Sequence, residues 1–137
     1  MSAPRAPGAS GAGAGSWKKL GLVFQPSGDV PWRLSHAATP TAEVLADSLV
    51  RVYFTSRDAA NRSHISSLEI DVRAPREVRN LSRAPLVVPG PPGSFDEHGA
   101  AMGCLIVDGP RRWLYYLGWS LADKSVPWRN TDRKSVV

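Results

Sequence analysis

The segment after residue 51 concentrates side chains that can bind ligands or move protons. Five of them follow an apolar run within eight residues: Arg57, Asp58, Asn61, Arg62 and His64. The forked donors of an arginine suit a carboxylate or a phosphate. Arg57 and Arg62 could instead pair with Asp58 and Asp96 to brace the loop. Asp58 and Asn61 also suit a tight turn. The sequence leaves both roles open.

Further side chains that could bind a ligand or move a proton lie at residues 36, 96–98 and 119. They are His36, Asp96, Glu97, His98 and Trp119. Each histidine could hydrogen-bond the backbone, or the two could hold a metal together with a carboxylate. No short ligand spacing such as His-x-His occurs, so we predict no metal and no cofactor. Trp119 suits stacking against the face of a sugar ring.

The elements that must position these residues are predicted to be β-strands. Short stretches rich in β-branched and aromatic residues are separated by Gly, Pro, Asp and Asn, and none shows a sustained helical period. The predicted strands cover residues 18–24, 35–45, 48–57, 63–72, 77–88, 98–107 and 111–119. Tight turns at 46–48 and 108–110 join two pairs of them as hairpins. The predicted fold class is all-β.

An internal repeat indicates the architecture. Residues 36–57 align without a gap over residues 98–119, so that His36 meets His98 and Tyr53 meets Tyr115. Two unrelated hairpins could share a turn and an apolar run, and that alternative stays open. A four-stranded unit of about 60 residues is the size of a β-propeller blade or somewhat larger. We therefore predict a β-propeller fragment of about one and a half four-stranded antiparallel blades, with blade one at 35–90 and a partial blade two at 95–130.

Alternate loops of an antiparallel blade emerge on the same face. The loops at 31–36, 57–64 and 89–99, and the segment that starts at residue 120, all fall on one face by this rule. They contain the histidines, arginines and carboxylates described above. The opposite face receives the segments 46–48, 73–77 and 108–112, which look like ordinary solvated turns. We therefore expect the polar groups to surround the mouth of a funnel.

Bulk composition limits the compartment and the partners. The 137 residues include 17 basic and 12 acidic ones, and the basic residues are scattered, unlike the dense run of a nucleic-acid arm. No apolar run approaches the ~20 residues that span a bilayer. The first residues lack the apolar core of a signal peptide, and Cys104, the single cysteine, lies in an apolar context typical of a buried thiol. We expect a cytoplasmic protein with no nucleic-acid or membrane partner.

The two ends differ from the part between them. Residues 1–16, mainly Gly, Ala, Ser and Pro, are predicted to be disordered because they cannot bury enough apolar surface. Residues 131–137 continue no earlier pattern and look like translated library adapter. The propeller part would then be residues 17–130, an N-terminal fragment of a longer protein. Open sheet edges and apolar faces would make the isolated chain aggregate or fold loosely.

With these residues placed, the chain resembles the five-bladed propeller superfamily of glycoside hydrolases, which includes arabinanases, xylosidases, invertases and levansucrases. It is most similar to an uncharacterised branch of that superfamily. The motifs that carry the resemblance are Ser35-His36, Pro40-Thr41-Ala42, Tyr53-Phe54, Arg57-Asp58, Asn61-Arg62-Ser63-His64-Ile65, Phe95-Asp96-Glu97-His98-Gly99, Leu114-Tyr115-Tyr116, Gly118-Trp119 and Val126-Pro127-Trp128-Arg129-Asn130. Together they cover roughly residues 17–130.

The chain departs from this family at catalytic positions. The family's base, an Asp in an Asp-Pro step, is replaced here by Thr39 before Pro40. Its general acid, a Glu, comes from a later blade that is not in this chain. Most glycoside hydrolases need two carboxyl groups flanking the bond. Asp96 resembles a second-blade carboxylate that orients sugar or tunes its neighbour's pKa, which makes it the candidate catalytic residue.

The resemblance implies a carbohydrate-active propeller of the glycoside hydrolase kind. The residues expected to bind the sugar are His36, Arg57, Asp58, Asn61, Arg62, His64, Glu97, His98 and Trp119. One alternative is a phosphorolytic relative, in which Arg and His hold inorganic phosphate in place of water. Another is a non-catalytic propeller that binds sugar or serves as a scaffold. Thr39 at the base position leaves open whether the protein is an enzyme.

Overall fold

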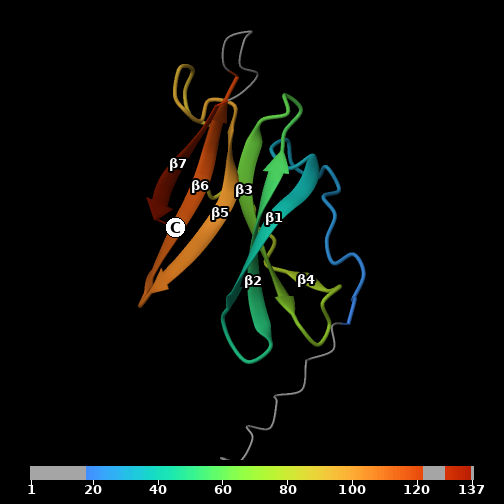
Figure 1. The fold of residues 1–137 in the computed structure, drawn as a ribbon. Helices are drawn as coiled ribbons and strands as arrows, with labels where there is room; N and C mark the ends of the chain where they lie inside the picture. The colour runs from blue at the N-terminus through green and yellow to red at the C-terminus, as the bar shows by residue number, and fades with distance from the viewer. Residues whose placement is uncertain (1–17, 122–128, 137) are drawn as a thin grey trace, which may run out of the picture.

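The computed structural model describes residues 18–121 and, as backbone, 129–136. Seven strands occur in these ranges: β1 (Ser35–Val44), β2 (Leu49–Arg57), β3 (Ser63–Asp71), β4 (Val78–Arg79), β5 (Gly99–Asp108), β6 (Arg111–Ser120) and β7 (Arg129–Val136). The described residues form no helix, and so none that is long and apolar enough to cross a membrane. The predicted all-β fold is confirmed (Figure 1).

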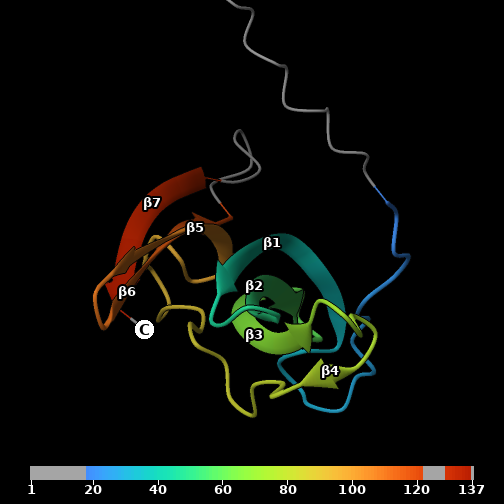
Figure 2. The same cartoon turned by 90° about the horizontal axis from the view of Figure 1, so that it is seen from below.

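The strands form one mixed, open sheet. Their order is β1-β2-β3-β5-β6-β7, and β4 pairs with β3 beside this path. Every pairing is antiparallel except that of β3 with β5, which rests on the single parallel pair Ser63↔Gly99. Within the described chain, β1 and β7 each have one neighbour, so the sheet does not close. Two antiparallel units, β1–β4 and β5–β7, therefore meet at one end (Figures 1 and 2).

The hydrophobic core lies between these two units. Tyr53 and Ile65 come from the first unit, and Ala100, Met102, Leu114 and Tyr116 from the second. Burial of one large apolar side chain contributes roughly 1.5–3 kcal/mol, so this shared core holds the units together. Strand β3 is buried without interruption from Ser63 to Glu69, because it is covered on both faces. On the outer face, Phe24 packs on Phe54 with ring centroids 5.3 Å apart.

Gly99 permits the single contact by which β3 and β5 pair. Its φ is +141°, a conformation that other residues rarely adopt. A Cβ built at this position would collide with the backbone of Ser63. The absence of a side chain is therefore what lets the two units approach here.

Both predicted hairpin turns are confirmed. Val44 pairs with Val50 across the first turn, and Asp108 pairs with Arg111 across the second. Gly109 has a φ of 54° in the two-residue turn, which glycine adopts without a steric penalty.

Two of the predicted strands were wrong. Residues 18–24 form no strand, and Gly21 interrupts them with a φ of +86°. The predicted strand at 77–88 is reduced to Val78–Arg79 and an isolated bridge of Ile65 to Val87. Pro85 removes a backbone donor from that segment, and Asn80, with a φ of 44°, turns the chain away. Strand β7 (Arg129–Val136) lies where no strand was predicted.

The repeat holds for the second strand of each hairpin but not for the first. Arg57 and Trp119 are equivalent, but they pair with Ser35 and Gly99, which lie 64 residues apart by number. The alignment of His36 over His98 is therefore displaced by two positions. One of the two positions comes from bulges, since β1 has two register shifts and β5 has one, and the other comes from the first turn, because Val44↔Val50 encloses one residue more than Val107↔Arg112.

The prediction of a buried thiol was also wrong. Cys104 is exposed. It follows the register shift between Met102 and Cys104 in β5, which turns this part of the strand away from the core.

Candidate functional site

The polar clusters expected to share a face do lie at one end of the molecule. A chain of paired residues defines this end: Ser35↔Arg57, Arg57↔Ser63, Ser63↔Gly99 and Gly99↔Trp119. The loop at 58–62 joins β2 to β3 here, and the loop at 89–98 leads into β5. The antiparallel alternation of strands thus brings together segments that are far apart in sequence.

A groove of about 440 Å³ opens at this end. Its lining residues are His36, Ala38, Thr39, Thr55, Arg57, Asn61, Ser63, Ala101 and Trp119. Four residues predicted to bind sugar are among them: His36, Arg57, Asn61 and Trp119. The other predicted site residues, which are Asp58, Arg62, His64, Asp96, Glu97 and His98, do not line it. Thr55, Ser63 and the two alanines were not foreseen as site residues.

Unusual backbone conformations are concentrated in the groove. Four non-glycine residues of the described chain have positive φ, and three of them line the groove: His36 at 63°, Thr39 at 47° and Asn61 at 62°. For a β-branched threonine this conformation is a genuine outlier. The two register shifts of β1 fall between Ser35 and Ala38 and between Ala38 and Thr41, so the bulges contain two of these residues. Strain of this kind, at about 1–3 kcal/mol each, collects at functional sites.

Arg57 and Trp119 form the polar and aromatic sides of the groove. Arg57 donates from Nη1 to the Asn61 Oδ1 atom at 2.8 Å, and its Cζ lies 6.0 Å from the centroid of the Trp119 ring. Trp119 donates from Nε1 to the Ser63 hydroxyl at 3.2 Å. His98 also packs near this ring, with centroids 5.8 Å apart. The Trp119 indole is therefore held by the hydrogen bond that its Nε1 donates to Ser63 and by packing against the His98 ring.

Thr39 and Thr55 support the floor of the groove. Their hydroxyl oxygens lie 2.9 Å apart, within hydrogen-bond distance. Thr55 Oγ1 also accepts a hydrogen bond from the Met102 backbone N–H at 2.8 Å, which ties β2 to β5. The position that holds Asp in the resembled hydrolases is thus a threonine that takes part in a structural contact.

Asp58, Arg62 and His64 brace the adjoining loop. One carboxylate oxygen of Asp58 accepts hydrogen bonds from Arg62 Nε at 2.9 Å and His64 Nε2 at 3.1 Å. The other accepts the Arg62 backbone N–H at 2.8 Å. Burial alone would raise the pKa of Asp58, but the hydrogen bonds from His64 and Arg62 outweigh it, so the pKa lies below its usual value. Of the two roles open to Arg62, the structure shows the bracing one.

Asp96 is buried behind the groove, with an exposure of 7%. Its carboxylate accepts hydrogen bonds from the Ser94 hydroxyl at 2.8 Å and the Tyr116 hydroxyl at 3.0 Å. Side chains at Gly90 and Gly118 would collide with it, so two glycines make room for this residue.

Glu97 and His98 form a second local pair. Glu97 accepts the Gly93 backbone N–H at 2.7 Å, and its other oxygen lies 3.4 Å from His98 Nδ1. The Leu121 N–H donates to the same His98 nitrogen at 3.2 Å. That nitrogen cannot accept from Leu121 and donate to Glu97 at once, so the tautomer of His98 decides between them. Among residues 18–121, no three His, Cys, Asp or Glu side chains gather as a metal site.

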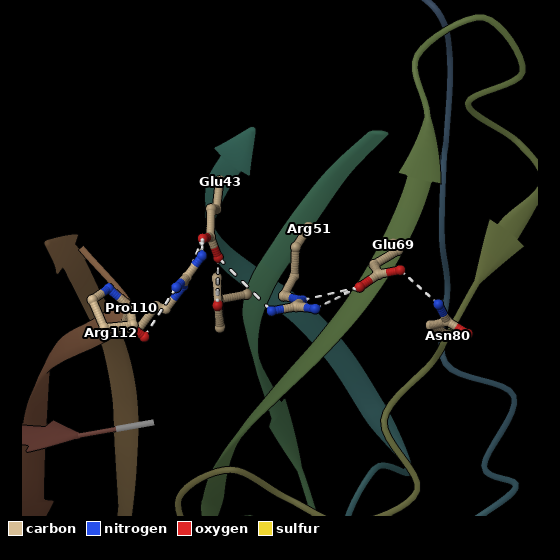
Figure 3. Close-up of polar contacts among 7 residues, drawn as sticks. Glu43, Arg51, Glu69, Asn80, Pro110 and Arg112 are labelled. Carbon is tan, nitrogen blue, oxygen red and sulfur yellow. Dashed lines mark hydrogen bonds and ion pairs between the residues drawn. The ribbon is translucent and has the colours of Figure 1, made fainter. Parts of the chain in front are cut away.

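The opposite end of the sheet carries an ionic network that the sequence did not reveal (Figure 3). Arg112 of β6 donates a hydrogen bond from Nε to Glu43 of β1 at 2.8 Å, and its Nη2 forms an ion pair with the same carboxylate at 2.8 Å. Arg51 pairs with Glu69 at 2.7 Å, and Asn80 donates to Glu69 at 2.6 Å. The Asn80 and Arg51 hydrogen bonds lower the pKa of Glu69. The available signal was the presence of charged residues within predicted strands. These residues were interpreted only as members of the strands.

Comparison with known proteins gives relatives but no activity. No protein-family model matches the chain. Uncharacterized protein Rv1502 and Uncharacterized protein MT1551, both of Mycobacterium tuberculosis, are 41% identical to it over 116 residues, or 85% of its length. The chain spans 38% of the length of these two relatives.

Proposed function

We propose that this chain is part of a β-propeller of the glycoside hydrolase superfamily and that it binds carbohydrate in the groove. The observation that carries the proposal is the groove itself, in which Trp119 offers an aromatic surface beside the hydrogen-bonding side chains of Arg57 and Asn61. Sugar sites combine these two features, because a sugar ring has an apolar face and polar edges. The strained backbone of β1 in the groove supports a binding role as well.

The arrangement of the two units supports the propeller. Each has antiparallel strands joined by short connections, and they pack face to face over a shared core. The similarity between residues 36–57 and 98–119 fits two successive blades.

Binding is favoured over hydrolysis by the residues in the groove. Most glycoside hydrolases need a pair of carboxyl groups. The described lining of the groove contains none, and Thr39 occupies the position of the usual base. Asp96 remains the candidate if the protein is catalytic, although the hydroxyl groups of Ser94 and Tyr116 already occupy its oxygens.

The test of sugar binding is a titration followed by NMR at the Trp119 indole N–H and, for the variant that lacks this indole, at the backbone amides of Ser63 and Ala101 in the groove lining. Glucose, xylose and arabinose, with their short oligosaccharides, would be added to the 137-residue chain. At least one should shift this resonance, and Trp119→Ala should weaken its binding about tenfold through lost stacking. Trp32→Phe is the control, because Trp32 does not line the groove. If no sugar shifts the resonance, or Trp119→Ala binds like the wild type, the proposal fails.

Turnover of aryl glycosides, with and without phosphate, separates binding from catalysis. Activity lost in Asp96→Asn but kept in Glu97→Gln would show hydrolysis that uses Asp96. Activity that requires phosphate would indicate the phosphorolytic alternative. Sugar binding without any turnover would mean that the groove only recognises carbohydrate.

A further inference from the structure

The charged and titratable residues of the groove are basic. Arg57 and His36 are the only residues of these kinds among its described lining residues. Arg57 is half-buried at the end of β2, and His36 is exposed on the bulged part of β1. The Ser35 hydroxyl lies 2.8 Å from His36 Nδ1, which leaves the Nε2 edge of the ring for a ligand. A ligand that enters this groove therefore meets a guanidinium and an imidazole.

The positive charge of Arg57 is not compensated within the described part of the chain. Its hydrogen-bond acceptor is the neutral amide oxygen of Asn61, and no ion pair joins it to a carboxylate in residues 18–121. In contrast, Arg62 in the same loop pairs with Asp58 at 2.9 Å. Within residues 18–121, Arg62 therefore has a carboxylate partner and Arg57 has none, a difference that their sequence context did not show.

The three nearby acidic residues are already engaged elsewhere. Asp58 accepts hydrogen bonds from Arg62 and His64. Glu97 accepts the Gly93 N–H and lies near His98. Asp96 accepts from two hydroxyl groups behind the groove. Because each carboxylate has its own partners, none of them is available to neutralise Arg57.

We infer that the groove binds a saccharide that carries an oxyanion, and that Arg57 holds this oxyanion while Trp119 stacks on the sugar ring. The oxyanion is a carboxylate or a phosphoryl group, since both accept the parallel hydrogen bonds of a guanidinium. Asn61 fixes one nitrogen of Arg57 and so orients the remaining donors. The inference rests on the proposed carbohydrate-binding function and adds the charge of the ligand to it.

The experiment compares matched neutral and acidic sugars on the 137-residue chain. Glucose is paired with glucuronate and with glucose 6-phosphate, and galactose with galacturonate, with the Trp119 indole N–H as the NMR readout. The acidic member of a pair should bind at least about tenfold more tightly at low salt, and the preference should shrink at high salt. Arg57→Gln should abolish the preference, so that the acidic and the neutral member of a pair bind this variant with affinities within about twofold of each other.

Arg62→Gln is the matched control, because Arg62 lies in the same loop and is engaged by Asp58. It should keep the preference for acidic sugars. Arg57→Lys, which retains the charge but not the fork, should keep part of it. Backbone amide spectra of each variant show whether the fold is intact.

A separate arm with inorganic phosphate distinguishes the source of the oxyanion. If phosphate shifts the resonances near Arg57 without displacing glucose, the site takes a free oxyanion beside the sugar. If only the acidic sugars bind tightly, the oxyanion is part of the saccharide. Either result supports an oxyanion site at Arg57.

Three results would overturn the inference. Equal affinities for neutral and acidic sugars in the wild type would refute the charge preference and leave carbohydrate binding intact. A preference that persists in Arg57→Gln would refute the role of Arg57. If no sugar and no phosphate binds, carbohydrate binding itself is refuted.

Discussion

Two arginines near the loop after β2 have different roles because they make different contacts. Arg62 is four residues from Asp58 and folds back onto it across a tight turn, whereas Arg57 ends a strand and points into the groove. Before the structure, both had the same two options. The difference depends on which side of β2 and of its turn each side chain occupies, and a run of polar letters does not specify that.

Asp58 makes the stability of the loop depend on acid. Its pKa in the folded protein lies below the ordinary value of 3.8, so the ionised form favours folding. This contribution is complete above the pKa of the unfolded chain and is lost as the pH falls through the lowered folded value. We expect the free energy of unfolding to fall more steeply between about pH 5 and pH 3 in the wild type than in Asp58→Asn.

Urea denaturation at a series of pH values measures this effect. At pH 6 the Asp58→Asn protein should be less stable by about 1–3 kcal/mol, since it loses charge-assisted hydrogen bonds to Arg62 and His64. Asp47→Asn, in the exposed turn after β1, is the control and should follow the wild-type curve. Parallel curves for the wild type and Asp58→Asn would contradict the assignment.

Positions within strands were harder to foresee than the strands themselves. The β-branched and aromatic stretches and the turn residues predicted both hairpins, and the structure confirms them. The bulges of β1 were not predicted, because a bulge depends on cross-strand pairing that a single strand does not show. Together with the longer first turn, they displaced His36 from equivalence with His98, and His36 lines the groove.

The ion pair of Glu43 with Arg112 joins strands from the two units, and a substitution at Arg112 tests how much it stabilises the fold. The Glu43 side chain is only 4% exposed, and Arg112 pairs with it through a hydrogen bond from Nε and an ion-pair contact from Nη2. Arg112→Ala should therefore lower the free energy of unfolding by about 1–3 kcal/mol, because it leaves a buried carboxylate with fewer donors. Thermal or urea unfolding measures the loss.

Arg111→Ala is the control for this change, because Arg111 is the exposed neighbour of Arg112 at the start of β6. It should alter the stability by no more than about 0.5 kcal/mol. Equal losses in the two variants would mean that the ion pair does not join the units.

At the scale of the whole molecule, the sequence predicted where the loops gather better than it predicted which way individual side chains face. The gathering of polar loops at one end followed from the alternation of antiparallel strands and needed no side-chain detail. The ionic network at the other end depends on which charged side chains face inward, and so it was missed. Segments 18–24 and 77–88 were predicted as strands from their apolar residues, but glycine and proline prevent regular pairing there.

The open sheet should make the isolated chain associate with itself. Val44, on the edge strand β1, is 74% exposed, and Ile106 on β5 is 50% exposed. Unpaired edges with apolar side chains promote pairing between molecules. Sedimentation velocity should show association that increases with protein concentration, and Val44→Lys should shift the population toward monomer.

Val72→Lys is the matched control, since Val72 is 49% exposed but lies outside the strands. It should leave the association unchanged. A monomer at every concentration, with a cooperative thermal transition, would contradict the expectation that the edges are adhesive.

The exposed thiol on β5 gives the protein a ready chemical handle. Cys104 is the single cysteine of the sequence, and it is not among the residues that line the groove. A maleimide reagent would therefore attach one label per molecule without any engineered mutation. Coupled through this sulfur to a solid support, every copy would be held by the same point and would present an unobstructed groove to an array of glycans.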